Sequence, residues 1–153
     1  MTSGNNPIPD CAALDVLTLL PQRPPIVMID RLASCEPASS RSELAVRADN
    51  IFCDPEGRFT AFGMMENIAQ TCAAHIGYCN LISGQPIRLG FIGAMRHARV
   101  LRLPRVGERL STQIDVLEDV FGMMLVAATI KVDGETVCEC EMKIALSGIV
   151  AQN

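Results

Sequence analysis

The sequence predicts an α+β domain in which a curved antiparallel β-sheet wraps around one central helix. Residues 63–78 have helical character and almost no charge, and strand-like segments precede and follow them. A helix that is apolar or small nearly all round must be covered on most sides, which a curved sheet achieves. No internal repeat divides the 153 residues, so we expect a single domain over 1–153, with a loose arm at 1–10.

The central helix contains a single carboxylate, Glu66, and no Lys or Arg. At about 100° per residue, one broad apolar face gathers Met65, Ala69, Cys72, Ala73 and Ile76. Burial raises the pKa of a carboxyl group, which suits a general acid or base. A structural role, in which the helix dipole stabilises an acid in the first turn, is the alternative.

The elements expected before this helix are short. Residues 11–20 predict a helix with Asp10 as its N-cap, ended by the proline-rich segment 21–25. A first strand, a turn, a second strand and a loop are expected at residues 26–32, 36–40, 41–49 and 50–62.

After a break at residues 83–86, only strands are expected. They fall at residues 87–103, 109–117, 121–132 and 136–146. Gly90 and Gly93 predict a bulge or the close approach of a ligand. Asp133 and Gly134 predict a two-residue hairpin.

Composition excludes several classes of protein. The net charge of −4 argues against general nucleic-acid binding, and no apolar run approaches the ~20 residues of a membrane span. The first residues lack the features of a secretory signal. Seven cysteines, an odd number without such a signal, predict free thiols in a reducing cytoplasm.

We expect no metal site and no cofactor. Cys138 and Cys140 lack the second pair of ligands that a zinc spacing requires, and His75 and His97 do not complete one.

Four motifs, in order, resemble those of the β-hydroxyacyl-acyl-carrier-protein dehydratases, which have the hot-dog fold. LLPQRPPIVMIDR at 19–31 is similar to the opening "LLPHRxPFLLVDRV" of that family, and ENIAQ at 66–70 to its "EAMAQ". ARVLR at 98–102 with VGE at 106–108, and VCEC at 137–140, are similar to its "ARFKR…PGD" and "VCEA". IAQTCAAHIGY and GFIGA resemble the divergent members found with aryl-polyene-type pathways.

The resemblance implies an enzyme that dehydrates β-hydroxyacyl thioesters in fatty-acid or polyene-type synthesis. Its partner would be an acyl carrier protein or acyl-CoA, and the substrate itself would carry the phosphopantetheine. It also implies a cytoplasmic homodimer or higher homo-oligomer, whose sheets join edge to edge.

One departure concerns the catalytic His of that family, which lies in a "GHFPG" loop. The corresponding residues 51–57 contain no His. His75 lies about half a turn of the helical wheel from Glu66, so we expect it to be packed or hydrogen-bonded. We expect His97 to be structural or part of a basic surface.

The remaining parts of a dehydratase site can be assigned through the resemblance. Glu66 corresponds to the family's Glu, and Gln70, one turn later, can orient its carboxylate. Backbone N–H groups of Gly63 and Met64 at the helix start are expected to polarise the thioester carbonyl.

The missing base leaves several alternatives open. Asp54 or Cys53 can replace it, or they are simply a turn Asp and a small buried thiol. Thioester hydrolysis needs only one helix carboxylate, so a thioesterase using Glu66 is an alternative. A non-catalytic partner subunit, which binds the carrier protein or an active homologue, is another.

Substrate binding is expected on the strand after the helix. Arginines cluster there, at Arg88, Arg96, Arg99, Arg102, Arg105 and Arg109. These arginines, Arg99 and Arg102 above all, can bind phosphates or an acidic carrier protein. The alternative is a solvated strand face whose arginines pair with Glu108, Asp115 and Glu118. Apolar residues and a glycine suit an acyl tunnel or, equally, a core: Met64, Met65, Phe91, Ile92 and Gly93.

Overall fold

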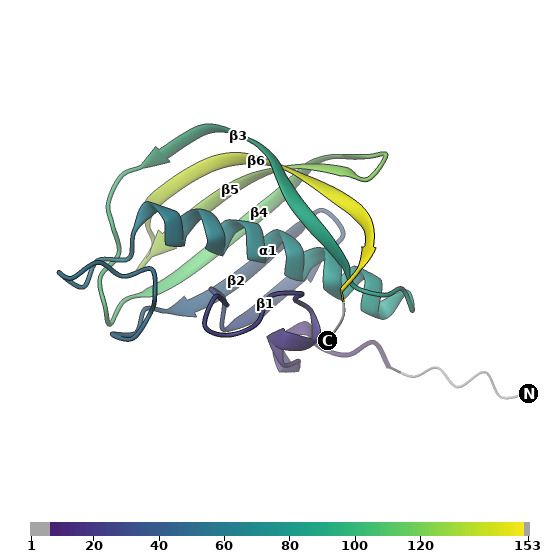
Figure 1. Cartoon of the computed structure of the whole chain (residues 1–153), viewed down its shortest axis with the longest axis horizontal. Helices are drawn as coiled ribbons and strands as arrows, with labels where there is room; N and C mark the ends of the chain where they lie inside the picture. Colours follow the sequence, from purple (N-terminus) through teal and green to yellow (C-terminus); the bar gives the residue numbers. More distant parts are fainter. Residues whose placement is uncertain (1–6, 152–153) are drawn as a thin grey trace, which may run out of the picture.

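The computed structural model describes residues 7–151 and shows a six-stranded antiparallel sheet curved around one long helix (Figure 1). The order of the strands in the sheet is β1-β2-β4-β5-β6-β3. The predicted α+β fold is therefore confirmed, whereas the expected arm at 1–10 lies largely outside the described residues. The elements are α1 (Ala61–Ile82), β1 (Arg31–Glu36), β2 (Ser39–Ala45), β3 (Arg88–Val100), β4 (Arg109–Val120), β5 (Met123–Val132) and β6 (Glu135–Val150).

Helix α1 is the central buried helix that the sequence predicts. It begins two residues earlier than expected, because the Thr60 side chain caps it by accepting from the Gly63 N–H. Met64, Ile68 and Cys72 are fully buried in the main core against the inner face of the sheet. The helix is thus wrapped by strands, as its lack of charge indicates.

The single helix expected at residues 11–20 is wrong. Two 3₁₀ turns occupy this region, η1 (Cys11–Ala13) and η2 (Val16–Thr18). Asp10 caps the first turn as predicted, but Asp15 caps the second, and its extended backbone interrupts any continuous helix.

The strand expected at residues 26–32 is also largely wrong, because strand pairing starts only at Arg31. The backbone of the preceding segment binds side chains of α1 instead. The C=O of Ile26 accepts from Gln70, and the N–H and C=O of Met28 bond to Gln70 and Asn67. This segment is therefore extended but crosses the helix rather than joining the sheet.

The strands and turns predicted after the helix are present, with β4 and β6 longer than predicted and β3 and β5 shorter. Three register shifts interrupt the pairing of β3 with β6, two of them beside Gly90 and Gly93, which confirms the predicted bulges. Asp133 and Gly134 both have positive φ, 49° and 79°, as a type I′ hairpin requires.

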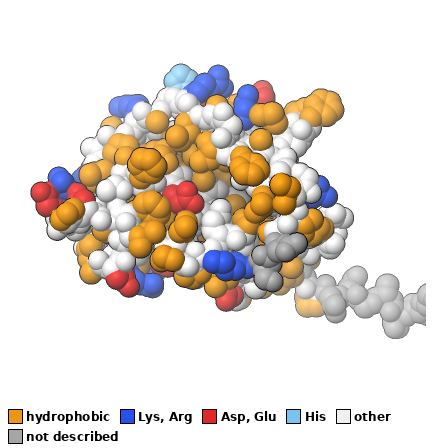
Figure 2. Space-filling view, viewed as in Figure 1, with side chains coloured by type: hydrophobic (Ala, Val, Ile, Leu, Met, Phe, Trp, Pro, Cys, Tyr) orange, Lys and Arg blue, Asp and Glu red, His pale blue; other side chains and the backbone are white. Residues whose placement is uncertain are grey.

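Strand β3 forms one edge of the sheet and pairs only with β6 in the described part of the chain. Its apolar side chains are exposed, including Phe91 at 56% and Met95 at 47%. Hydrophobic side chains gather over the face where α1 and β3 lie (Figure 2). Within residues 7–151, no helix is long and apolar enough to cross a membrane.

Candidate functional site

Glu66 lies in the second turn of α1 and is half-buried. Its carboxylate oxygen Oε1 accepts a hydrogen bond of 2.8 Å from Gln70 Nε2, one helical turn later. This is the contact expected for Gln70. The catalytic roles of both residues stay predictions, but the geometry fixes one oxygen of the carboxylate and leaves the other for a ligand.

Gln70 is itself held rigidly, because it is fully buried and makes three hydrogen bonds. Its Oε1 accepts from the Met28 N–H at 2.6 Å, and its Nε2 also donates to the Ile26 C=O at 2.9 Å. The segment that crosses the helix therefore sets the orientation of the amide, and the amide sets the orientation of Glu66.

Asn67 adds a second anchor that the sequence analysis missed. Its Nδ2 donates to the Met28 C=O at 2.8 Å, and its Oδ1 accepts from Thr112 Oγ1 on β4 at 2.6 Å. Asn67 and Thr112 are fully buried. A polar side chain next to the only acid of a buried helix is the sequence signal that could have revealed this anchor.

A narrow apolar groove lies between α1 and the β3 edge, with a volume of about 40 Å³. Phe91 and Ile92, both predicted to bind substrate, line it opposite Ala69 and Ala73 of the helix. Gly93 is absent from its lining, and Met64 is buried in the main core. Pro21, Gln22, Ile76, Arg88, Gly90, Ile144 and Leu146 complete the groove.

Asp54 is engaged in its own loop, and none of its hydrogen bonds reaches Glu66. Its Oδ1 accepts from the backbone N–H groups of Arg58 and Glu56, and its Oδ2 from Arg58 Nε at 2.8 Å. These contacts lower the pKa of the Asp54 carboxyl, and the hydrogen bond from the Arg58 backbone N–H has the largest effect. Burial raises the pKa of the nearby Cys53 thiol. The structure thus gives Asp54 the turn-forming role of the alternative interpretation, whereas Cys53 is half-exposed rather than a buried thiol.

The backbone donors expected at the helix start already have acceptors. The Gly63 N–H points to Thr60 Oγ1 at 3.4 Å, and the Met64 N–H donates to the Thr60 C=O at 3.0 Å. A Cβ at position 63 would overlap the ring of Phe59 and lie 2.8 Å from Phe52 Cβ, so the glycine is required by packing. Polarisation of a carbonyl by these two donors stays a prediction.

His75 is packed and hydrogen-bonded, as predicted. It is buried, and its Nδ1 lies 2.6 Å from Ser40 Oγ. Burial lowers the pKa of His75. His75 lies nine positions after Glu66, about 13 Å along the helix. His97 is exposed, with a positive φ of 55° at a bulge of β3.

The arginines after the helix are partly paired with acids. Arg96 and Arg99 lie 3.7 and 3.6 Å from glutamates of β6, Glu141 and Glu139. Arg102 contacts Glu108 at 2.8 Å and Glu135 at 3.4 Å. Of the acids expected to pair with these arginines, Glu108 is the one that does so among the described residues. Hydrogen bonding to Arg102 lowers the pKa of the Glu108 carboxyl. These ion pairs are exposed or half-exposed, so a binding role for Arg99 and Arg102 stays a prediction.

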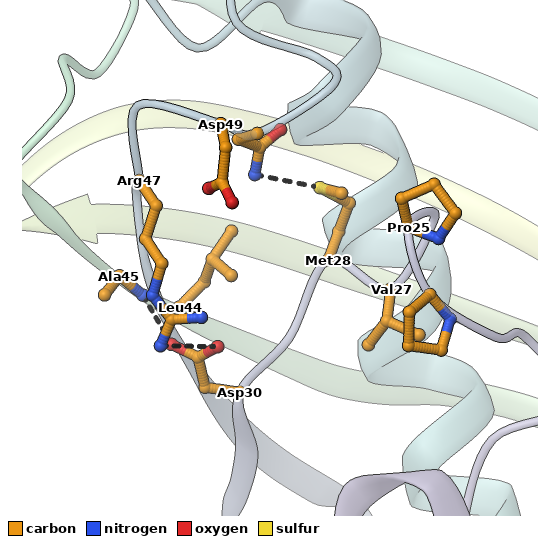
Figure 3. A pocket seen from close by; sticks show the side chains of 10 residues that line it. Pro25, Val27, Met28, Asp30, Leu44, Ala45, Arg47 and Asp49 are labelled. Carbon is orange, nitrogen blue, oxygen red and sulfur yellow. Dashed lines mark hydrogen bonds and ion pairs between the residues drawn. The ribbon is translucent and has the colours of Figure 1, made fainter.

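A larger pocket of about 280 Å³ opens between the crossing segment and the end of β2 (Figure 3). On one side of it Asp30 contacts Arg47 at 3.9 Å, and the Asp30 Oδ2 accepts from the Ala45 N–H. The side chain of Asn50 donates to Met28 Sδ on another side. Glu66 does not line this pocket, although both adjoin the segment that anchors Gln70.

Comparison with known proteins gives one family and several solved structures. Residues 14–151 match the ApeP-like family model, described as ApeP dehydratase. The chain is 26% identical over 149 residues to the 3-hydroxyacyl-[acyl-carrier-protein] dehydratase FabZ of Tolumonas auensis, which covers 92% of the chain and 98% of that protein. FabZ of Latilactobacillus sakei is 29% identical over 139 residues, covering 84% and 93%.

Among solved structures, the dehydratase heterocomplex ApeI:P from Xenorhabdus doucetiae superposes with a TM-score of 0.84 at 17% identity, covering 88% of this chain and 92% of that one. The PaaI protein of Escherichia coli, from an operon for phenylacetic acid degradation, superposes with a TM-score of 0.61 at 13% identity, covering 74% and 80%. At these identities the two structures confirm the hot-dog fold. The family match over 14–151 shows more: this chain is a hot-dog protein of the ApeP-like dehydratase family.

Proposed function

We propose that this chain is one subunit of a dehydratase that acts on β-hydroxyacyl thioesters, and that a second, different hot-dog chain completes its active site. The FabZ relatives are named as acyl-carrier-protein dehydratases, and one structural neighbour is described as a dehydratase heterocomplex. The thioester would be carried by an acyl carrier protein in the cytoplasm.

The observation that carries this proposal is the surroundings of Glu66. Dehydration requires a base for the Cα proton and an acid for the leaving hydroxyl. Gln70, a neutral amide, is the side chain hydrogen-bonded to Glu66 within residues 7–151. His75 is about 13 Å away along the helix and Asp54 is bound to Arg58, so the described chain holds one of the two groups.

Strand β3 offers the surface for the second subunit. It is 13 residues long, its outer edge is unpaired in the described part of the chain, and it exposes Phe91, Ile92 and Met95. A long apolar edge strand favours pairing with another strand. A partner there would also border the groove between α1 and β3.

A different partner suits the chemistry better than a second copy. A homodimer would repeat the same set of groups in both halves, and within residues 7–151 that set holds no imidazole hydrogen-bonded to Glu66. A heterodimer can place a histidine of the second chain opposite Glu66. The expected homodimer is therefore the alternative assembly.

The proposed step uses Glu66 as the acid. The base of the partner chain takes the Cα proton, and the thioester carbonyl becomes enolate-like. The Cβ–O bond then breaks, Glu66 gives its proton to the leaving hydroxyl, and water and the α,β-unsaturated thioester are released. Gln70 keeps the Glu66 carboxyl oriented throughout.

Thioester hydrolysis is the second candidate, and one specific observation favours it. A single carboxylate oriented by a neighbouring amide, as Glu66 is by Gln70, is sufficient to activate water against a thioester carbonyl. The two candidates leave different products, since hydrolysis yields a free acid.

Mass spectrometry of the acyl product tests the proposal. The chain alone, and the chain copurified with a hot-dog dehydratase from its own genome, would receive a β-hydroxyacyl group on acyl carrier protein. We expect loss of water, about 18 mass units, with the complex only, and at least a ~100-fold lower rate with Glu66→Gln. Glu118→Gln, an exposed acid of β4, is the matched control and should retain full activity.

Two results would contradict the proposal. Full activity of the Glu66→Gln complex would exclude this site, and free acid formed by the chain alone would establish the thioesterase.

A further inference from the structure

A second cluster of reactive side chains lies under the C-terminal half of α1, away from Glu66. It contains Cys35 from β1 and His75 and Cys79 from α1. Their ligand atoms, two thiol sulfurs and one imidazole nitrogen, all lie within 4.8 Å of one another. His75 and Cys79 share one face of the helix because they are four residues apart.

We propose that these three residues bind a zinc ion. Sulfur and imidazole nitrogen are the ligands that zinc prefers in proteins, whereas calcium and magnesium take oxygen ligands. Two thiolates also cancel the charge of a divalent ion, so the bound site has no net charge and can remain partly buried.

The distances require only small side-chain movements. A tetrahedral zinc ion with bonds of about 2.3 Å to sulfur holds its ligand atoms roughly 3.5–3.8 Å apart. The Cys35 sulfur already lies 3.5 Å from His75 Nδ1. The two ligand atoms that are farthest apart are separated by at most 4.8 Å. They would have to approach by about 1 Å, which a change of cysteine rotamer can provide.

The surroundings of the cluster include a polar contact that zinc would displace and an apolar one that it would keep. Ser40 Oγ lies 2.6 Å from His75 Nδ1, so coordination through Nδ1 would replace that hydrogen bond. Cys35 also packs against a small apolar cluster at the base of the helix, which includes Cys11 and Leu32. Such an apolar shell limits access of water to bound metal.

One coordination position would remain open. Cys35 and Cys79 are half-exposed, while His75 is buried, so the open side faces solvent. Three protein ligands and a fourth position for water or another ligand are the usual arrangement of an accessible zinc site. The ion would link β1 to α1 about 13 Å along the helix from Glu66, and it would stabilise the fold without entering the thioester chemistry.

Cobalt titration of the full chain tests this site directly. The protein would be treated with a chelator, kept reduced with a phosphine, and titrated with Co²⁺, whose thiolate complexes absorb in the near ultraviolet. We expect one Co²⁺ per chain, displacement of the absorption by Zn²⁺, and a higher melting temperature with Zn²⁺ than without it.

Cysteine variants decide whether the cluster is responsible. Cys35→Ser and Cys79→Ser should each weaken cobalt binding by at least about 100-fold and abolish the rise in melting temperature, while remaining folded by circular dichroism. Cys53→Ser, a half-exposed cysteine outside the cluster, is the matched control and should bind like the parent chain.

The proposal is overturned by any of three results: no thiolate absorption with Co²⁺, binding that survives in the Cys35→Ser and Cys79→Ser variants, or equal loss in Cys53→Ser. If Co²⁺ binding is absent after reduction and a Cys35–Cys79 disulfide forms on oxidation, the cluster is a redox pair rather than a metal site.

Discussion

Two sets of polar residues in this molecule differ in how they are held. The first set lies beneath α1, where Asn67, Gln70 and Thr112 are fully buried and every contact is a hydrogen bond of 2.9 Å or less. The second set is the arginine row in and after β3, where Arg96 and Arg99 contact glutamates at 3.6–3.7 Å in exposed positions and Arg102 contacts Glu108 at 2.8 Å in a half-exposed one.

The difference indicates which residues define the site and which remain available to a partner. Buried polar groups lose their bonds to water on folding. A buried group that also lacks a protein partner lowers the stability of the fold by about 1–3 kcal/mol. Exposed ion pairs contribute about 0–1 kcal/mol and exchange partners readily. The network around Gln70 therefore orients Glu66, whereas the arginines can leave their glutamates for an acidic surface.

The largest effect is expected from Gln70→Ala. Loss of the amide leaves the N–H of Met28 and the C=O of Ile26 without partners and removes the donor to Glu66. We expect the free energy of unfolding, measured by urea titration, to fall by about 2–4 kcal/mol. Dehydration by the complex should fall as well, because the Glu66 carboxyl is no longer oriented.

The matched control for this prediction is Gln113→Ala. Gln113 is exposed on β4, and its side chain bonds only to Asp115 on the same strand. Its change should stay within about 0.5 kcal/mol. Similar losses in the two variants would show that the crossing segment contributes no more than a surface hydrogen bond.

Glu108→Gln tests the most enclosed ion pair of the second set. Arg102 binds both oxygens of Glu108, at 2.8 and 3.1 Å, and the Arg105 N–H donates to Oε1. This bonding lowers the pKa of Glu108 in the folded state. The ion pair therefore stabilises the fold fully above the unfolded-state pKa of about 4.5, and this contribution is lost as the pH falls through the lower folded-state pKa. We expect a loss of about 1 kcal/mol at pH 7.

The pH dependence distinguishes this result from a packing defect. The difference in unfolding free energy between the parent chain and Glu108→Gln should shrink steadily below pH 4.5, where the parent loses the same interaction. A difference that stays constant down to pH 3 would show that the ion pair is not its cause.

The sequence predicted the helix and its acid more reliably than the contacts that hold the acid. An uncharged helix needs cover on most sides, so the wrapping sheet follows from residues 63–78 alone. Residues 26–30 have the same β-branched character whether they join a sheet or cross a helix, and only the side chains of Asn67 and Gln70 decide between the two. Strand propensity therefore gave the wrong element there.

The cysteine cluster was hidden for a different reason. Cys35 is 40 residues before His75 in the sequence, and metal-ligand spacings within one short segment do not reveal such a pair. The fold brings β1 under the C-terminal half of α1 and so places the thiol beside the imidazole. For this reason the sequence predicted no metal site, and the structure supports proposing one.

The smallest effect on stability is expected from Arg99→Ala, and it sharpens the comparison most. Arg99 is 66% exposed and 3.6 Å from Glu139, so the free energy of unfolding should change by less than about 0.5 kcal/mol. If the arginine row receives an acidic carrier protein, the affinity for that carrier should fall several-fold and its dependence on salt should weaken.

Arg31→Ala on the opposite edge strand, β1, is the matched control for Arg99→Ala. Arg31 is also exposed and paired with a glutamate of the neighbouring strand, Glu43, at 2.8 Å. The two variants remove the same charge from opposite edges of one sheet, so a general effect of net charge would weaken carrier binding equally in both. A loss confined to Arg99→Ala would place the carrier on the β3 side, beside the groove that Phe91 and Ile92 line. Equal binding by the parent and both variants would leave these arginines as a solvated face.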